Sequence, residues 1–117
     1  MLEITVEASE DGAGYHILRL VGEVDAYTVG EFREALAGIE NVNWLIVDLS
    51  EVPFMDSAGL GALIGAIRRV REGGGDVAVV SKNPGLNKLL HTTGFDRIVP
   101  VTESIEDALA ALREQAD

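Results

Sequence analysis

The chain has 117 residues, with 20 acidic against 9 basic side chains and a formal net charge of −11. This length predicts a single domain with one core, and so acidic a surface would repel the phosphates of nucleic acids. The lack of cysteine excludes disulfides and thiolate metal sites, and no apolar run is long enough to span a membrane. The N-terminus lacks the features of a signal peptide, which favours a cytoplasmic protein that binds other proteins.

The first part of the chain predicts two strands and a helix. Residues 2–6 alternate between apolar and polar side chains, as in a half-buried strand, and Asp11–Gly14 predicts a turn. Residues 15–21 predict a second strand, paired with the first as an antiparallel hairpin. Thr28 and Glu31 have the spacing of a capping box at the start of a helix.

The rest of the chain alternates between strands and helices. We predict strands at 42–49, 76–80 and 97–101, the last at a sheet edge because Pro100 has no backbone donor. Helices are predicted to follow residue 56, the pair Asn83 and Pro84, and residue 103, with Gly94 as a left-handed helix end. This order implies right-handed crossovers and parallel pairing. The fold class is therefore α/β: one small mixed sheet, an N-terminal hairpin followed by parallel βαβ units, with about four helices.

Ser57 lies where a buried strand has ended and a helix begins. A serine at this position can cap the first helical turn, and the positive end of the helix dipole favours an anionic group nearby. The hydroxyl is thus expected at an exposed point between two rigid elements. Taken alone, this position indicates only a helix cap.

Small side chains recur along the same predicted helix, at Ala58, Gly61, Ala62 and Gly65. Their three- and four-residue spacing places them in a stripe over which another backbone could pass closely. From the residues alone, packing of this stripe against the domain's own sheet is the preferred interpretation, and both interpretations can hold for different glycines.

Four segments in this order resemble the STAS-domain family of anti-sigma factor antagonists, or anti-anti-sigma factors: Gly22–Asp25, Leu45–Ser50, Met55–Gly61 and Leu89–Phe95. The resemblance covers essentially the whole chain and implies a single STAS domain over residues 1–117. It implies that the unphosphorylated protein binds an anti-sigma factor that is also a serine kinase, thereby freeing a sigma factor. The kinase would use ATP to phosphorylate Ser57 and end the complex, and a serine phosphatase would reverse the mark.

The resemblance also implies roles for the neighbours of Ser57. Glu23, Asp25 and Asp56 would contribute to partner binding, together with three small residues, Ala58, Gly59 and Gly61. The residues alone favour solvated turn residues for Glu23 and Asp25, with Asp25 also a candidate helix cap. Many relatives carry a second hydroxyl residue where this chain has Ala58, so Ser57 is the one hydroxyl residue of the motif. We expect no catalytic residue, cofactor or metal in the chain itself, and a monomer or weak dimer.

Other functions fit the motif less well. The spacing Gly59-x-Gly61-x-x-x-Gly65 is one residue too long for a dinucleotide-binding turn, and the next strand ends in Ser81–Lys82 without an acid for a ribose. No Gly-x-Ser-x-Gly elbow or general base accompanies Ser57, which argues against a hydrolase. The remaining alternative is a STAS module that senses a nucleotide or lipid, or serves as a scaffold, without a phosphoswitch.

Overall fold

A computed structural model of the chain describes residues 2–9, 14–39 and 42–115. Its elements follow one another as β1 (Glu3–Ala8), β2 (Tyr15–Val21), α1 (Val29–Ala37), β3 (Trp44–Glu51), α2 (Ser57–Glu72), β4 (Asp76–Val80), α3 (Pro84–Thr92), the 3₁₀ helix η1 (Phe95–Arg97), β5 (Val101–Thr102) and α4 (Ile105–Gln115).

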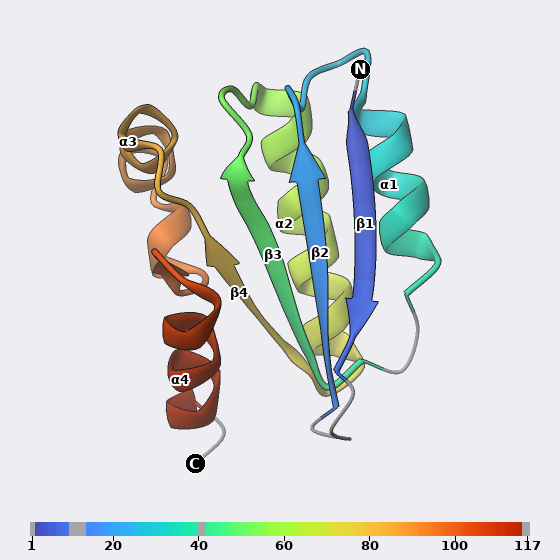
Figure 1. Ribbon diagram of the computed structural model, residues 1–117, viewed down its shortest axis with the longest axis vertical. Helices are drawn as coiled ribbons and strands as arrows, with labels where there is room; N and C mark the ends of the chain where they lie inside the picture. Colours follow the sequence, from blue (N-terminus) through green and yellow to red (C-terminus); the bar gives the residue numbers. More distant parts are fainter. Residues whose placement is uncertain (1, 10–13, 40–41, 116–117) are drawn as a thin grey trace.

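The five strands form one sheet in the order β1-β2-β3-β4-β5 (Figure 1). Strands β1 and β2 pair antiparallel, from Glu3 opposite Val21 to Ala8 opposite His16, and every later neighbour pairs in parallel. The predicted hairpin, the predicted parallel units and the mixed α/β sheet are therefore confirmed. The predicted turn at residues 11–14 lies largely outside the described residues.

Alternation along the strands divides the core between the two faces of the sheet. One face carries Leu18, Val47 and Val79, which are fully buried together with the apolar sides of α1, α2 and α3. The other face carries Ile46 and Ala78, which pack against α4. In Figure 1, α1 and α2 lie behind the sheet and α4 lies beside β4, so α4 covers only part of its face.

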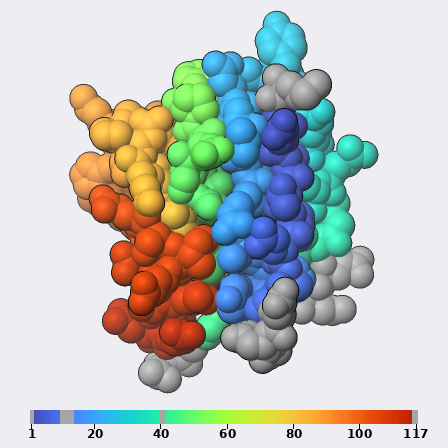
Figure 2. Space-filling model, viewed as in Figure 1, coloured from blue at the N-terminus to red at the C-terminus, as the bar shows by residue number. Residues whose placement is uncertain are grey.

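On the same face, polar side chains lie over β1 and toward the carboxyl ends of β2 and β3. Arg19 reaches Glu7 at 2.7 Å on the neighbouring strand and Asp48 at 3.3 Å on the other side. Asp48 also accepts a 3.0 Å hydrogen bond from the backbone N–H of Ser50, near the end of β3. Figure 2 shows β1 and β2 at the surface beside α4. Surface ion pairs of this kind contribute little to stability.

Two element boundaries differ from the prediction. β3 spans Trp44–Glu51 and is shifted by two residues toward the C-terminus relative to the predicted 42–49. The predicted strand at 97–101 is wrong at its start, because Gly94 adopts a left-handed conformation (φ 78°) and the chain continues into η1. Only Val101 and Thr102 pair with β4, at the sheet edge as predicted.

The caps of the last two helices are as predicted. The Asn83 side chain accepts hydrogen bonds from the N–H groups of Gly85 and Leu86, with Pro84 as the first helical residue of α3. The Ser104 hydroxyl accepts from the Asp107 N–H at 3.0 Å and so caps α4. The two caps therefore fix where α3 and α4 begin.

Candidate functional site

The start of α2 is held in place by backbone pairing between two loops at the carboxyl end of the parallel strands. The Val24 N–H donates to Phe54 O at 3.0 Å, and the Asp56 N–H donates to Val24 O at 3.1 Å. Val24 and Met55 form a parallel bridge, and both side chains are buried. The segment 22–28 after β2 therefore lies beside the first turn of α2, at the upper edge of Figure 1.

Asp56 is the cap of α2. Its Oδ1 accepts from the N–H groups of Ala58 at 2.9 Å and Gly59 at 3.1 Å, while its Oδ2 accepts from the Ala26 N–H at 3.1 Å. The prediction that Ser57 caps this helix is wrong. Asp56 precedes it in extended backbone (φ −96°, ψ −173°), and its carboxylate takes the free donors of the first turn.

Ser57 is the first residue of α2 and is exposed. Within the part of the chain that the structure describes, its hydroxyl makes no hydrogen bond, because the donors that it could have capped are bound by Asp56. The backbone around the hydroxyl is nevertheless fixed by the Val24 to Met55 bridge. The site thus presents a free hydroxyl on a rigid support, beside a carboxylate.

The two acidic residues predicted beside Ser57 differ in what they do. The Asp25 Oδ1 accepts from the N–H groups of Tyr27 at 2.9 Å and Thr28 at 3.1 Å, so this carboxylate orders the turn that leads into α1. Glu23 is exposed, and its side chain makes no hydrogen bond or ion pair with any described residue. Glu23 is therefore the freer of the two carboxylates for contact with another protein.

The predicted capping box at Thr28 and Glu31 does not form. Thr28 precedes α1, but its side chain makes no cap hydrogen bond, and its own backbone is helical (φ −104°, ψ −13°). The Thr28 hydroxyl turns back instead, accepting from the Asp25 N–H at 3.0 Å and donating to Glu23 O at 2.9 Å. No side chain therefore caps α1 at its N-cap residue, and the Asp25 carboxylate orders the turn just before the helix.

Gly59 allows a close approach within the chain itself. A Cβ atom at this position would lie 2.7 Å from both Cγ1 and the carbonyl oxygen of Val24, and 2.8 Å from Cγ of Met55. Gly59 is buried. Its lack of a side chain serves the packing of α2 against the loop that carries Val24, and it presents no surface to a partner.

The other small residues of α2 divide between the inside and the outside. Ala62 is 7% exposed and packs in the core, and Ala58 is half-buried. Gly61 and Gly65 are exposed, and a Cβ atom on either would meet nothing within 4 Å. Ser57, Gly61 and Gly65 recur every four residues and so lie in line along the outer side of the helix. This line, the bare strip of α2, has no side chain larger than that of serine. Gly59 and Ala62 fit the packing interpretation of the stripe, whereas Gly61 and Gly65 take no part in the core.

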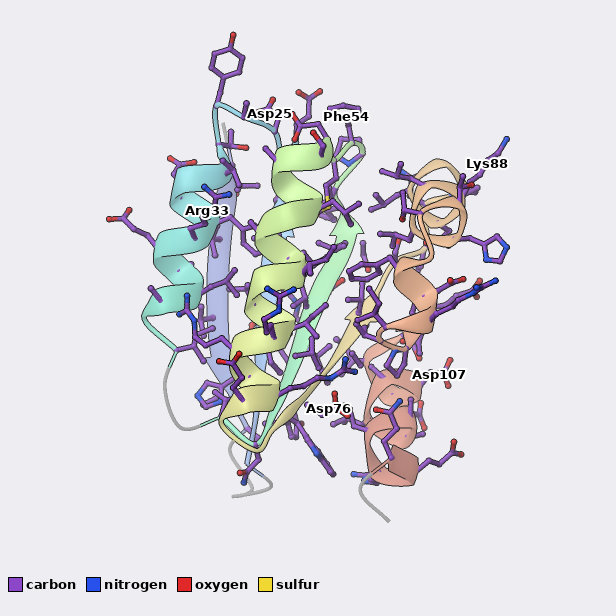
Figure 3. The ribbon with its side chains drawn as sticks, turned by 180° about the vertical axis from the view of Figure 1, so that it is seen from behind. Asp25, Arg33, Phe54, Asp76, Lys88 and Asp107 are labelled. Carbon is purple, nitrogen blue, oxygen red and sulfur yellow. The ribbon has the colours of Figure 1, made fainter. Side chains whose placement is uncertain are left out.

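Two aromatic residues beside the site were not singled out from the sequence. Phe54, in the loop before α2, is 50% exposed, and Tyr27, in the turn capped by Asp25, is 96% exposed. Figure 3 shows Asp25 and Phe54 near each other at the end of the molecule where α2 begins. Exposed aromatic side chains are unusual enough to indicate binding surfaces. Their position in the two loops flanking Ser57 was the signal that could have found them.

Two further properties of the described residues bear on the kind of site. Across residues 2–9, 14–39 and 42–115, no three histidine, aspartate or glutamate side chains come together in a group that could hold a metal ion. None of the helices there is both long and apolar enough to cross a bilayer.

Comparison with known proteins agrees with this geometry. The STAS domain family matches residues 5–108. The anti-sigma F factor antagonist of Paenibacillus polymyxa is 33% identical over 107 residues, covering 88% of this chain and 91% of that protein. The anti-sigma-B factor antagonist of Listeria monocytogenes is 29% identical over 102 residues, covering 86% and 90%.

The fold agrees as well. The crystal structure of an anti-sigma factor antagonist from Mycobacterium paratuberculosis superimposes with a TM-score of 0.86 at 28% sequence identity, covering 97% of this chain and 95% of that one. The match thus includes the five-stranded mixed sheet and the segment around Ser57. The chain belongs to the STAS-domain family of anti-sigma factor antagonists.

Proposed function

We propose that this protein is a switch controlled by phosphorylation of Ser57. The unphosphorylated form binds an anti-sigma factor that is also a serine kinase, and so releases a sigma factor. The kinase brings ATP and magnesium and transfers a phosphoryl group to Ser57, which ends the complex until a serine phosphatase removes it. The protein itself is a regulator without catalysis of its own, and it acts in the cytoplasm, where ATP is present.

The observation that carries this proposal is the free hydroxyl of Ser57. A serine that caps a helix has its oxygen occupied by backbone donors, whereas Asp56 binds those donors here. The Ser57 hydroxyl is exposed at the end of a rigid element. A kinase can therefore reach it without unfolding the start of α2.

The added negative charge explains how phosphorylation of Ser57 would dissociate the complex. Phosphorylation adds roughly −1.5 to −2 charges beside the Asp56 carboxylate. In a docked interface, leaving a charge unpaired or opposite a like charge costs about 2–5 kcal/mol. At about 1.4 kcal/mol per tenfold change in affinity, this weakens binding by roughly thirtyfold to a few thousandfold.

The bare strip of α2 supplies the docking surface in this proposal. Because Gly61 and Gly65 carry no side chain, a partner backbone can approach the helix axis next to Ser57. Phe54 and Tyr27, in the two loops beside the start of α2, add exposed aromatic surface, and Glu23 offers a free carboxylate in the same loop as Tyr27. Aromatic anchors around a tightly packed centre are typical of protein interfaces.

A pull-down from cells of the source organism with purified wild type, Ser57→Ala and Ser57→Asp tests the proposal. We expect wild type and Ser57→Ala to capture an ATP-binding anti-sigma factor, and Ser57→Asp to lose most of it. Incubation of the captured kinase with ATP should then add one phosphate to wild type and none to Ser57→Ala, as measured by intact mass. Equal capture by all three proteins, or phosphate on another residue, would contradict the switch and favour a ligand-sensing or scaffold module.

A further inference from the structure

A second site lies away from Ser57, beyond the carboxyl end of β4. A hollow of about 270 Å³ opens between α3, η1 and β5, and its polar lining comes from Ser81, Asn87, His91, Asp96, Thr102 and Glu103. None of the residues that line this hollow belongs to the bare strip of α2. The carboxyl ends of parallel strands are where open α/β sheets commonly bind their ligands.

Two buried oxygens of this lining lack a hydrogen-bond partner. Ser81 is 0% exposed, and its Oγ has no partner among the described residues. The Asn87 Nδ2 donates to Ser81 O at 3.3 Å, which fixes the side-chain amide and leaves Oδ1, also buried, without a donor. An unsatisfied buried polar group costs about 1–3 kcal/mol. Two such oxygens on adjoining elements therefore call for a hydrogen-bond donor from outside the fold.

The mouth of the hollow is rich in acceptors as well. Glu103 is exposed, and Asp96 is held by His91, with 2.7 Å between Nδ1 and Oδ2. The Thr102 hydroxyl donates to Val79 O at 3.3 Å or Ser104 O at 3.1 Å, which leaves its own oxygen free to accept. The turn through Gly94 brings Asp96 to His91. The lining thus offers hydroxyl, amide and carboxylate oxygens.

From these contacts we infer that the hollow binds a guanidinium or alkylammonium group. Such a group carries several N–H donors and a positive charge, which match the buried oxygens inside and the carboxylates at the mouth. Lys88, on the same helix as Asn87, cannot fill the hollow because it points away from the rest of the molecule (Figure 3). The group is carried either by a free amine or by an arginine or lysine side chain of another protein.

Nuclear magnetic resonance titration with small probes tests this inference on the whole chain. The probes are N-acetyl-arginine amide, its uncharged isostere N-acetyl-citrulline amide, and agmatine as a free amine. We expect the arginine probe and agmatine to shift the backbone amide signals of Ser81, Asn87 and Glu103 with saturation, and the citrulline probe to shift them at least about fivefold more weakly. Tighter binding of agmatine identifies a free amine as the ligand, and equal or tighter binding of the arginine probe identifies a protein side chain.

Matched variants distinguish binding at this site from nonspecific electrostatic attraction of a cation to an acidic protein. Glu103→Gln and Ser81→Ala should each lower the affinity for the arginine probe by about five- to tenfold. This is the range expected for one charge-assisted hydrogen bond in a partly exposed site. Glu106→Gln, at an exposed position on α4, should leave the affinity unchanged. Ser81→Ala removes an unpartnered hydroxyl, so the fold should be retained, which thermal melting checks.

Three results would overturn the inference. The first is the lack of saturable shifts at the hollow with either cationic probe. The second is an equal effect of Glu103→Gln and Glu106→Gln. The third is stronger binding of calcium chloride than of the arginine probe, which would make the hollow a metal site. None of these results bears on phosphorylation of Ser57, so the two proposals fail independently.

Discussion

At the scale of single residues, α2 contains glycines that serve opposite purposes. Gly59 is buried, and its Cα lies against Val24 and Met55, where a methyl group has no room. Gly61, two residues later, faces solvent and has nothing near it. One glycine therefore holds the helix in place, and the other keeps the outside of the helix bare.

The same substitution at these two positions should therefore have opposite effects on stability. Gly59→Ala forces a Cβ against the carbonyl oxygen of Val24, and we expect a loss of about 1–3 kcal/mol in the free energy of unfolding. Gly61→Ala replaces a poor helix former by a good one, and we expect it to raise the free energy of unfolding by up to about 1 kcal/mol. Urea unfolding of both variants measures the difference. Similar values for the two variants would show that the packing around Gly59 is looser than described.

A large side chain at Gly61 should block the partner without harming the fold. We expect Gly61→Leu to reduce the affinity for the anti-sigma factor by at least about tenfold, since a large side chain then covers the bare strip of α2 beside Ser57. Ala110→Leu, at an exposed position on α4, is the matched control and should bind as wild type does. Surface plasmon resonance with the captured kinase gives both affinities. Normal binding by Gly61→Leu would place the docking surface elsewhere.

At the scale of elements, the site depends on one carboxylate that ties a helix to a loop. Asp56 binds two donors of α2 with one oxygen and the Ala26 N–H with the other. The backbone bridge between Val24 and Met55 lies directly beneath it. Loop and helix are thereby positioned as one unit, which explains how an exposed hydroxyl can also be a well-ordered one.

Asp56→Ala should loosen this unit. The loss of a helix cap costs about 0.5–2 kcal/mol, and the additional loss of the contact to Ala26 places the expected value near the upper end. Asp107→Ala, in the first turn of α4, is the matched control. Its helix is capped by Ser104, so a smaller effect is expected. Urea unfolding compares the two, and limited proteolysis should show new cleavage between residues 22 and 28 in Asp56→Ala alone.

At the scale of the whole molecule, the proposed switch works by surface charge on an unchanged fold. The chain carries a net charge of −11 before any phosphate is added. The positive end of the α2 dipole favours a phosphate on Ser57 by about 0.3–1 kcal/mol, while the Asp56 carboxylate opposes it. Because Asp56 has already bound the N–H groups of the first turn, the phosphate gains no cap there. These two contributions should nearly cancel.

We therefore expect phosphorylated and unphosphorylated protein to melt within about 5 °C of each other, which corresponds to about 1 kcal/mol for a domain of this size. Differential scanning calorimetry measures this shift, with kinase-treated Ser57→Ala as the control for handling. Amide signals away from residues 22–28 and 54–61 should stay in place in NMR spectra. A much larger drop in Tm would show that the mark acts by unfolding α2 instead of by repelling the partner.

The sequence by itself determined most of the fold. Period-two and helical patterns, the caps at Asn83 and Ser104 and the left-handed Gly94 each depend on residues within a few positions of one another. Local signals of this kind were not all decisive, since the capping box at Thr28 and Glu31 did not form. The family segments likewise led to the prediction that Ser57 and its acidic neighbours form the site, because the order of these segments along the chain is itself the signal.

Only the tertiary structure decided which of two adjacent residues caps α2 and which glycines face outward. Aspartate and serine are both good helix caps, so the sequence does not decide between Asp56 and Ser57. Asp56 is the cap because its backbone N–H donates to Val24 O and its second carboxylate oxygen accepts from the Ala26 N–H, about 30 positions away. The stripe of small residues was divided by the same packing, which buried Gly59 and left Gly61 in solvent. Contacts between segments so far apart leave no periodic trace in either segment, so the free hydroxyl of Ser57 became visible only in three dimensions.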